Sequence, residues 1–171
     1  MYSLSNGKKI NIKNKIEKSN IILFNRPKYR FIGDLSYIPT ELKINNNYLY
    51  IFIIIDHFSK LLNAYLLKNK DHKSIVNCME KFFKYYGLPK EFGCDNGAEF
   101  LNKAVKNILE HNNIKMINGR PYQPHSQGVV ERVHRTIRTG LVARYIENPN
   151  NYNIEDSLSI VVTNIIIRYI Q

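Results

Sequence analysis

Apolar residues mark five strand-like segments between residues 30 and 117. Runs rich in aliphatic and aromatic residues at residues 30–38, 48–58 and 61–67 predict three strands, and the short connections between them favour an antiparallel meander. Two shorter apolar runs, at residues 90–94 and 114–117, predict a fourth and a fifth strand.

Four further segments are predicted to be helices: residues 72–86, 100–112, 127–146 and 154–170. In the first two, apolar residues recur at the spacing of one helix face. Gly87 and Pro89 follow the first helix, as residues that end helices do. The order of three strands, helix, strand, helix, strand and two helices predicts an α/β fold in which helices cover a central sheet.

Positive charge is concentrated at the start of the chain. The 171 residues carry a formal net charge of +11, and residues 1–30 contribute 8 − 1 = +7 of it. We expect a basic N-terminal arm at residues 1–29 and a globular domain at residues 30–171, because 44% of the residues are apolar and can form a core. This charge favours a polyanionic partner, and DNA is the expected one. The arm can be a solvated leader or a segment that contacts DNA.

The apolar runs and the cysteines bear on the compartment. The longest apolar run, residues 48–55, is too short to span a bilayer, so we expect no contact with a membrane. Two cysteines are too few for a disulfide framework, which favours a reducing compartment.

Three acidic residues stand where packing alone does not explain an acid. Asp34 lies inside an apolar strand, Asp95 lies at the end of a strand, and Glu131 lies on the long helix. A buried carboxylate without a partner is costly, so it normally pairs with a cation or binds a metal. If the three carboxylates converge, their oxygens suit a hard cation such as Mg²⁺.

Each of these acids also has a structural interpretation. Asp34 can pair with a lysine across the sheet. Asp95 can form a turn with the Asn-Gly pair that follows it. Glu131 can form an ion pair with Arg135, four residues further along the helix. Taken one at a time these interpretations are favoured, and only the set of three indicates a metal site.

The spacing of the acids and the strings around them match a known signature. Thirty-five residues separate Asp95 from Glu131. Residues 94–100 read CDNGAEF, residues 121–132 read PYQPHSQGVVER, and residues 53–60 read IIIDHFSK. Together, over roughly residues 29–148, they resemble the D,D-35-E signature of integrases from retroviruses and gypsy-type LTR retrotransposons.

The resemblance implies a fold, a reaction and a cofactor. The fold would be RNase H-like, with a five-stranded mixed sheet and helices on both faces. The reaction would be DNA 3′-end processing and strand transfer, carried out in the nucleus. Asp34, Asp95 and Glu131 would be the catalytic triad and would hold two Mg²⁺ or Mn²⁺ ions, which stabilise the attacking and the leaving oxygen of an in-line displacement.

DNA contacts are expected from the long helix and from the loop before it. Residues at helical spacing from Glu131 lie near the same helix face and would meet the DNA. Arginines there would bind phosphates, although solvated arginines on an exposed helix are the alternative. Five residues are expected to contact DNA: Tyr122, Gln127, His134, Arg135 and Arg138.

The chain departs from complete integrases. Their N-terminal zinc-binding domain uses two His and two Cys, whereas residues 1–30 hold neither, so we expect no zinc. The C-terminal DNA-binding barrel of the family is also not expected within these residues. The expectation is therefore an excised core, a fragment of a polyprotein, or a decayed or co-opted copy.

Two other functions stay open at this point. Another RNase H-like nuclease would need an essential Glu on the first helix, where Glu80 alone is available. A domesticated integrase could bind DNA without catalysing any reaction. A substrate assay separates the first from an integrase, and substitution of Asp95 separates the second.

The last predicted helix indicates self-association. Its apolar residues, Ile160–Val162 and Ile165–Ile167, cannot all face one core. An exposed apolar surface of this kind indicates a partner. Because integrase cores dimerise through their first and last helices, the resemblance implies a homodimer or a higher oligomer.

Overall fold

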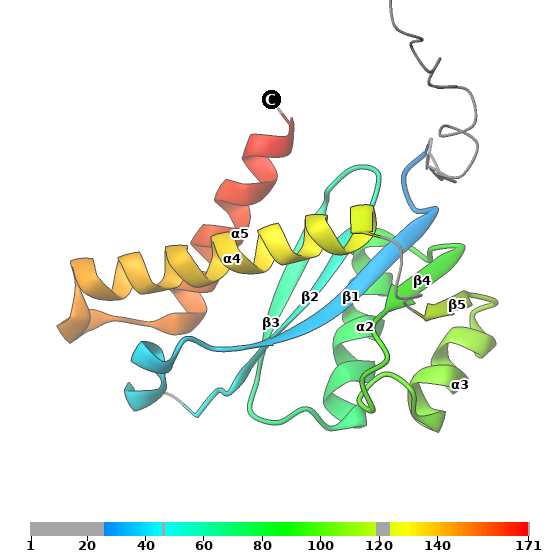
Figure 1. Cartoon of the computed structure of the whole chain (residues 1–171), viewed down its shortest axis with the longest axis horizontal. Helices are drawn as coiled ribbons and strands as arrows, with labels where there is room; N and C mark the ends of the chain where they lie inside the picture. The colour runs from blue at the N-terminus through cyan, green and yellow to red at the C-terminus, as the bar shows by residue number, and fades with distance from the viewer. Residues whose placement is uncertain (1–25, 46, 119–123, 171) are drawn as a thin grey trace, which may run out of the picture.

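The computed structural model describes residues 26–45, 47–118 and 124–170, and within them it leaves out the side chains of residues 43–45, 118, 124–127 and 170. Figure 1 shows five strands and four α-helices in this part of the chain. The elements are β1 Arg30–Tyr37, η1 Thr40–Asn45, β2 Tyr50–Asp56, β3 Leu62–Leu67, α2 His72–Tyr86, β4 Glu91–Cys94, α3 Lys103–His111, β5 Lys115–Asn118, α4 Pro124–Glu147, η2 Pro149–Asn151 and α5 Ile154–Ile170. Every strand and α-helix predicted from the sequence is confirmed, and the short helices η1 and η2 are additions.

The strands form one mixed sheet in the order β3-β2-β1-β4-β5. The pairs β1–β2 and β2–β3 are antiparallel, which confirms the predicted meander. The pairs β1–β4 and β4–β5 are parallel. β1 therefore lies at the centre of the sheet, with an antiparallel neighbour on one side and a parallel neighbour on the other.

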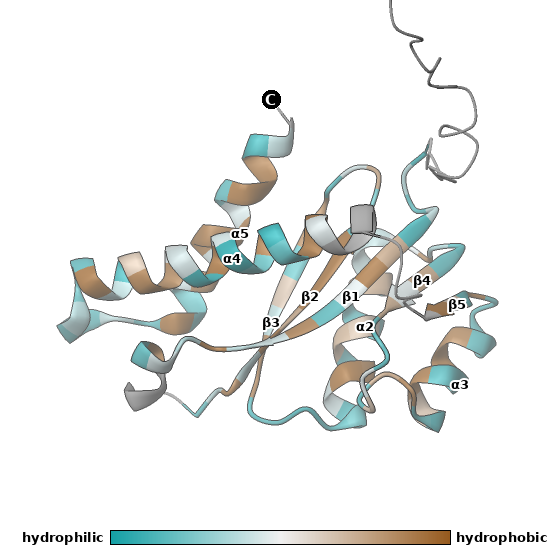
Figure 2. Cartoon of the chain, viewed as in Figure 1, coloured by the Kyte–Doolittle hydropathy of each residue, from teal (hydrophilic) through white to brown (hydrophobic). Residues whose placement is uncertain are grey.

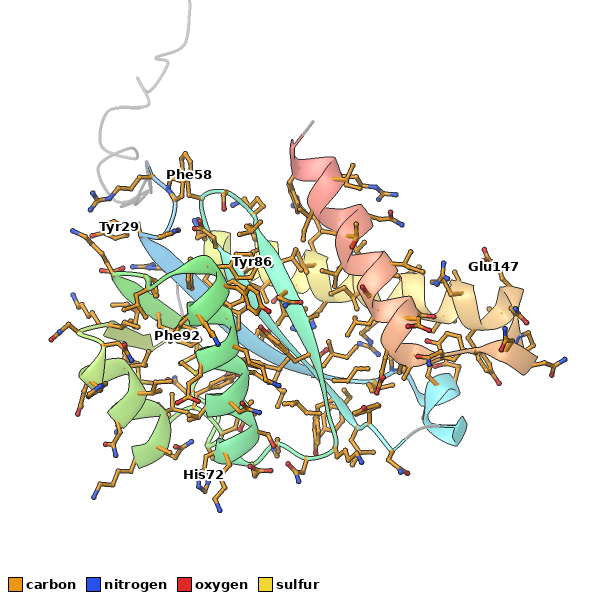
Figure 3. All side chains as sticks on the ribbon, turned by 180° about the vertical axis from the view of Figure 1, so that it is seen from behind. Tyr29, Phe58, His72, Tyr86, Phe92 and Glu147 are labelled. Atoms are coloured by element: carbon orange, nitrogen blue, oxygen red, sulfur yellow. The ribbon has the colours of Figure 1, made fainter. Side chains whose placement is uncertain are left out.

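Helices cover both faces of the sheet, as expected. Because side chains alternate along a strand, Phe31 and Ile32 of β1 enter two different cores. The core that contains Ile32 is closed by α4 and α5, and the core that contains Phe31 is closed by α2 and α3. Figure 2 shows the hydrophobic residues along β1 and β2, and Figure 3 shows α2 and α3 from behind, with Phe92 on their side of the sheet.

Local hydrogen bonds explain where the helices begin and end. Asp71 accepts a hydrogen bond from the Ser74 N–H at 2.9 Å and starts α2, and Gly87, with φ of 85°, ends it. The prediction that the second helix begins at residue 100 was wrong, because Asn102 accepts from the Val105 N–H at 3.0 Å and starts α3 at Lys103. The prediction that the third begins at residue 127 was also wrong, since α4 begins at Pro124.

Most of the basic N-terminal arm predicted at residues 1–29 lies outside the described residues, so the arm stays a prediction. Among the helices that the structure describes, none has both the length and the apolar composition that a membrane span requires.

Candidate carboxylate site

The direction of Asp34 follows from its place on β1. Alternate residues of a strand face the same side of the sheet, so Asp34 faces the same side as Ile32. Ile32 is buried in the core under α4 and α5. The Asp34 carboxylate therefore points toward α4, and it keeps about 30% of its side-chain surface exposed.

Asp95 lies directly after the neighbouring strand β4, at the place that corresponds to Asp34. The last registered pair of the parallel strands β1 and β4 is Ile32 with Gly93, and Asp34 and Asp95 each follow that pair by two residues. Two residues before the same pair, the side chains of Arg30 and Glu91 meet, with Nε 2.9 Å from Oε2. Equivalent positions of these two strands thus carry side chains on one face, and the face is that of Asp34.

Asp95 also shapes the turn in which it lies. Its Oδ1 accepts a hydrogen bond from the Gly97 N–H at 3.0 Å, which confirms the structural interpretation of this residue. The Asp95 side chain is exposed. A role in the turn uses one carboxylate oxygen and leaves the other directed to solvent or to a ligand.

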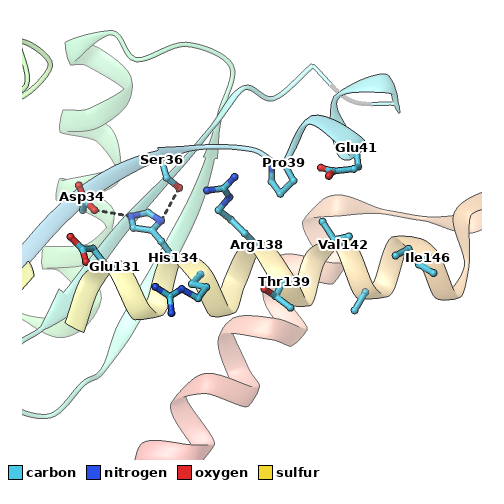
Figure 4. Close-up of a pocket in the computed structure, with 12 residues that line it drawn as sticks. Asp34, Ser36, Pro39, Glu41, Glu131, His134, Arg138, Thr139, Val142 and Ile146 are labelled. Carbon is cyan, nitrogen blue, oxygen red and sulfur yellow. Dashed lines mark hydrogen bonds and ion pairs between the residues drawn. The ribbon is translucent and has the colours of Figure 1, made fainter. Parts of the chain in front are cut away.

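α4 brings the third acid to the same region. A cavity of about 680 Å³ lies between β1, η1 and α4, and Asp34 and Glu131 both line it (Figure 4). The helix face predicted from the sequence is confirmed, because the cavity is also lined by His134, Arg135 and Arg138. Away from Asp34 and Glu131 the lining is mostly apolar and includes Pro39, Val142, Ala143 and Ile146.

His134 contacts Asp34 directly. Its Nε2 lies 3.1 Å from Asp34 Oδ2, and its Nδ1 lies 2.8 Å from Ser36 Oγ (Figure 4). The lysine partner considered for Asp34 is thus replaced by a histidine from α4. The alternative for Glu131 is not observed either, because Glu131 and Arg135 form no ion pair.

The three acids do not form a closed metal site. Asp34 and Glu131 line the cavity, whereas Asp95 is not part of its lining. In the part of the chain that the structure describes, no three His, Cys, Asp or Glu side chains lie together in a way that could hold a metal ion. Tyr122 lies outside the described residues. Gln127 lies near the start of α4, and its side chain is not described.

Three polar residues of the cavity lining, Ser36, Glu41 and Thr139, were not predicted from the sequence. Ser36 lies two residues after Asp34 on β1, so strand alternation placed it on the same face and could have identified it. Glu41 comes from η1, which no apolar pattern indicated. Glu41 lies beside Pro39 at the end of the cavity away from Asp34 and Glu131 (Figure 4).

The cysteine next to Asp95 is unreactive in this arrangement. Burial, together with the Asp95 charge, raises the pKa of the Cys94 thiol to about 12. Burial raises the pKa of Cys78 to about 11. Both thiols are free and buried, so neither supplies a thiolate ligand at neutral pH.

A family model decides the relationship of this chain to known proteins. The model of the integrase core domain matches residues 25–124, which is 100 of the 171 residues. The chain belongs to the integrase core domain family. The matched segment contains Asp34 and Asp95 and ends before Glu131. The inclusion of Glu131 in the candidate site of this integrase core therefore rests on its spacing from Asp95 and on the cavity that it lines with Asp34.

Curated relatives of this integrase core are retroviral and transposon-derived. The Gag-Pro-Pol polyprotein of Mason-Pfizer monkey virus is 37% identical over 93 residues, which are 54% of this chain and 5% of the polyprotein. A transposon-derived protein of Caenorhabditis elegans is 31% identical over 124 residues, which are 72% of this chain and 42% of that protein. The chain thus spans less than half the length of these relatives.

Solved structures show the same fold. A chain of the simian T-cell lymphotropic virus intasome, solved in complex with PP2A regulatory subunit B56 gamma, matches with a TM-score of 0.69 at 23% identity, covering 80% of this chain and 47% of that one. The HTLV-2 integrase catalytic core domain, solved with magnesium in a trimeric form, matches with a TM-score of 0.65 at 19% identity, covering 80% of this chain and 83% of that one. The five-stranded mixed sheet with helices on both faces is therefore the RNase H-like fold of retroviral integrase cores, as expected.

Proposed function

We propose that this integrase core catalyses metal-dependent DNA 3′-end processing and strand transfer. One observation carries the proposal: Asp34 of β1 and Glu131 of α4, far apart in the sequence, line one cavity together with Arg135 and Arg138. Acids that suit a hard cation and bases that suit phosphate thus share one surface.

Asp34, Asp95 and Glu131 would be the catalytic and metal-binding residues, holding two Mg²⁺ or Mn²⁺ ions. Their donors are carboxylate oxygens, which hard cations prefer, and the side chains of Asp95 and Glu131 are exposed. The three carboxylates repel one another, and we infer that they converge when bound cations offset that repulsion. When bound, the two ions would activate the attacking oxygen and stabilise the leaving oxygen.

Other residues around the cavity would bind and orient the DNA. Arg135 and Arg138 are exposed on the side of α4 that carries Glu131, where they would bind phosphate oxygens near the reacting bond. Gln127 and Tyr122 would contact the DNA from the start of α4 and from the loop before it. The attacking group is water when an end is trimmed and a DNA 3′-hydroxyl when strands are joined, so no protein nucleophile is needed.

The reaction implies partners and a place. The substrates would be the ends of an element's DNA and a target DNA, which favours the nucleus as the compartment. The HTLV-2 core has been solved in both dimeric and trimeric forms. For this chain we propose a homodimer or a higher oligomer, supported by the apolar residues exposed on α5.

The nuclease alternative has less support than strand transfer. An RNase H-type enzyme would use a Glu on the first helix, and Glu80 of α2 lines a different cavity, between α2 and α3. Asp34 does not line that cavity. Glu80 therefore serves best as a control for the acids of the α4 cavity.

Substitution of Asp95 tests the proposed reaction. Asp95→Asn keeps the hydrogen-bond acceptor for Gly97 but removes the charge that would bind a cation. We expect the variant to lose Mg²⁺-dependent strand transfer, and its reversal on branched DNA, by more than about 100-fold, because even outer partners of a metal ligand contribute about 10- to 100-fold. DNA binding, followed by fluorescence anisotropy, should stay within about 2-fold of the unmodified chain, since Arg135 and Arg138 are untouched.

The matched control is Glu80→Gln, which removes one negative charge from an exposed position on α2. It should leave both joining and DNA binding unchanged. Full activity of Asp95→Asn would exclude the metal mechanism. If the unmodified chain binds DNA but joins no strands, the domesticated, non-catalytic alternative is favoured.

A further inference from the structure

His134 is a buried polar residue beside the proposed metal ligands. Its exposed fraction is 7%, and its ring lies between Ser36 and Asp34, which both come from β1 (Figure 4). The neighbouring residues of α4 that line the same cavity, Arg135 and Arg138, are exposed. A buried ring is poorly placed to bind a DNA phosphate, so His134 needs a different role from its neighbours.

The contacts of the ring determine which nitrogen carries the proton. An ionised carboxylate only accepts hydrogen bonds, so Nε2, 3.1 Å from Asp34 Oδ2, must be the N–H nitrogen. In a neutral imidazole the other nitrogen is then an acceptor, and Nδ1 takes the hydroxyl hydrogen of Ser36 at 2.8 Å. Asp34 thereby sets the tautomer of the ring, and Ser36 donates to the nitrogen that is left as an acceptor.

The Nε2–H depends on Asp34 for its partner. Nε2 is buried and has no hydrogen bond of regular geometry, and its ion-pair contact is with Asp34 Oδ2. A small rotation of the carboxylate would align the two groups. Because a buried donor without an acceptor is unfavourable, the ring favours the rotamer of Asp34 that brings Oδ2 toward it.

We propose that His134 is a positioning residue that holds Asp34 Oδ2 and thereby directs Oδ1 toward a divalent cation. The inference rests on the proposed function, because Asp34 must be a metal ligand for the position of its carboxylate to matter. A side chain that hydrogen-bonds to a metal-binding residue, without itself contacting the metal, typically changes the metal affinity by about 10- to 100-fold. Ser36 acts one step further out, through its hydrogen bond to Nδ1, which holds the ring in place.

Binding of Mn²⁺ to the full chain, measured by calorimetry, tests the role of His134. His134→Leu removes the donor, and we expect it to weaken Mn²⁺ binding by about 10- to 100-fold. His134→Asn keeps an amide donor and should recover part of the loss, while Ser36→Ala should weaken binding by a smaller factor. His111→Leu, at an exposed histidine of α3, is the matched control and should leave the affinity unchanged.

A spectroscopic measurement tests the contact without any metal or reaction. Long-range ¹H–¹⁵N correlations identify which imidazole nitrogen carries the proton. We expect the Nε2–H form for His134 in the chain alone and a mixture of both tautomers in Asp34→Ala, which removes the acceptor for Nε2–H. This measurement and Ser36→Ala keep the proposal testable if His134→Leu does not fold.

The outcomes separate this proposal from the proposed function. Unchanged Mn²⁺ affinity in both His134→Leu and Ser36→Ala would overturn the positioning role, as would an Nδ1–H tautomer. If the unmodified chain binds no Mn²⁺ at this site, the proposed function fails and the positioning role fails with it. If Asp34→Asn weakens Mn²⁺ binding but the His134 and Ser36 variants do not, Asp34 is a metal ligand and His134 does not position it.

Discussion

At the scale of single residues, Asp56 shows what an acid with a purely structural role looks like in this chain. It is 2% exposed, and its carboxylate accepts hydrogen bonds from the N–H groups of Lys28 and Phe58, both at 3.1 Å, and from Ser59 Oγ at 2.8 Å. The bonds from Phe58 and Ser59 fix the turn after β2, and the bond from Lys28 joins the segment before β1 to that turn. Asp34 differs because it faces a cavity and has one contact there, with His134.

His57, in the same turn, gives a pH prediction. Burial, and after it the positive charges of Lys60 and Arg30, lower its pKa from 6.5 to about 4. Between these two values the unfolded chain binds more protons than the folded chain, so the free energy of unfolding falls as pH drops from about 6.5 toward 4. We expect a loss of about 1 kcal/mol from this residue between about pH 7 and pH 5, after allowing for its partial exposure.

Urea unfolding at the two pH values checks this prediction. His57→Gln removes the titrating group, so the variant should lose less stability between them than the unmodified chain. Since all other groups titrate in both proteins, the difference between the two losses isolates His57. Equal losses in the two proteins would contradict the pKa assigned to His57.

The sequence predicted which residues share the cavity where spacing alone fixes the direction of a side chain. The acids of β1 and α4 and the helix face with Arg135 and Arg138 are of this kind. The contact of His134 with Ser36 could not be predicted, because it joins residues 98 positions apart through the packing of α4 on the sheet. The proposed convergence of the three carboxylates on a cation also depends on more than spacing.

At the scale of elements, α4 connects the core to the site. Val133, Ile137 and Leu141 of this helix are buried under the sheet, and Glu131 and Arg135 are exposed on another side. The sequence predicted the face that carries Glu131 and Arg135, but neither the buried face nor the first residue of the helix. Proline is favoured in the first turn of a helix, where its missing N–H costs nothing, and Pro124 therefore begins α4 rather than ending a loop.

The packing of α4 on α5 depends on a glycine. A Cβ atom at Gly140 would lie 2.9 Å from Cγ2 and 3.0 Å from Cγ1 of Val161, a short and rigid side chain that is itself buried. Gly140→Ala gains up to about 1 kcal/mol of helix propensity, but the overlap costs about 1 to 3 kcal/mol. We therefore expect a net loss of stability of about 1 kcal/mol in thermal or urea unfolding.

The same helix supplies a control for this substitution. A Cβ atom at Gly128 would have no described part of a neighbouring element within 4 Å, so Gly128→Ala should be neutral or stabilising. A stabilising Gly140→Ala would contradict close packing of α4 against α5. Both variants replace a glycine of α4 by alanine, so the gain in helix propensity is nearly the same in both and largely cancels when their stabilities are compared.

At the scale of the whole molecule, the strand order places the site. β1 lies between β2 and β4, so the chain returns from α2 to the centre of the sheet rather than to its edge at β3. Short connections predicted that the first three strands are neighbours, but neither the apolar pattern nor the resemblance to integrases indicated that the fourth strand pairs with the first. The parallel register of β1 and β4 brings Asp34 and Asp95 to corresponding positions.

The surface of α5 leads to a prediction about assembly. Val161, Val162 and Ile165 are buried against the sheet and α4, whereas Ile160 and Ile167 are 41% and 47% exposed. We expect a dimer or larger species in size-exclusion chromatography with light scattering, and Ile167→Glu should shift it toward the monomer, because a charge at an apolar contact is unfavourable. Asn164→Glu, at another exposed position of α5, is the control, and a strict monomer at high concentration would contradict the prediction.

The central claim is that Asp34, Asp95 and Glu131 gather around divalent cations. Anomalous X-ray diffraction from crystals of the chain soaked in Mn²⁺ measures this most directly, because it locates the metal without reference to activity. We predict a peak held by the carboxylates of Asp34 and Asp95, and a second position that includes Glu131. Mn²⁺ bound elsewhere on the chain, with no peak between residues 34 and 95, would contradict the claim.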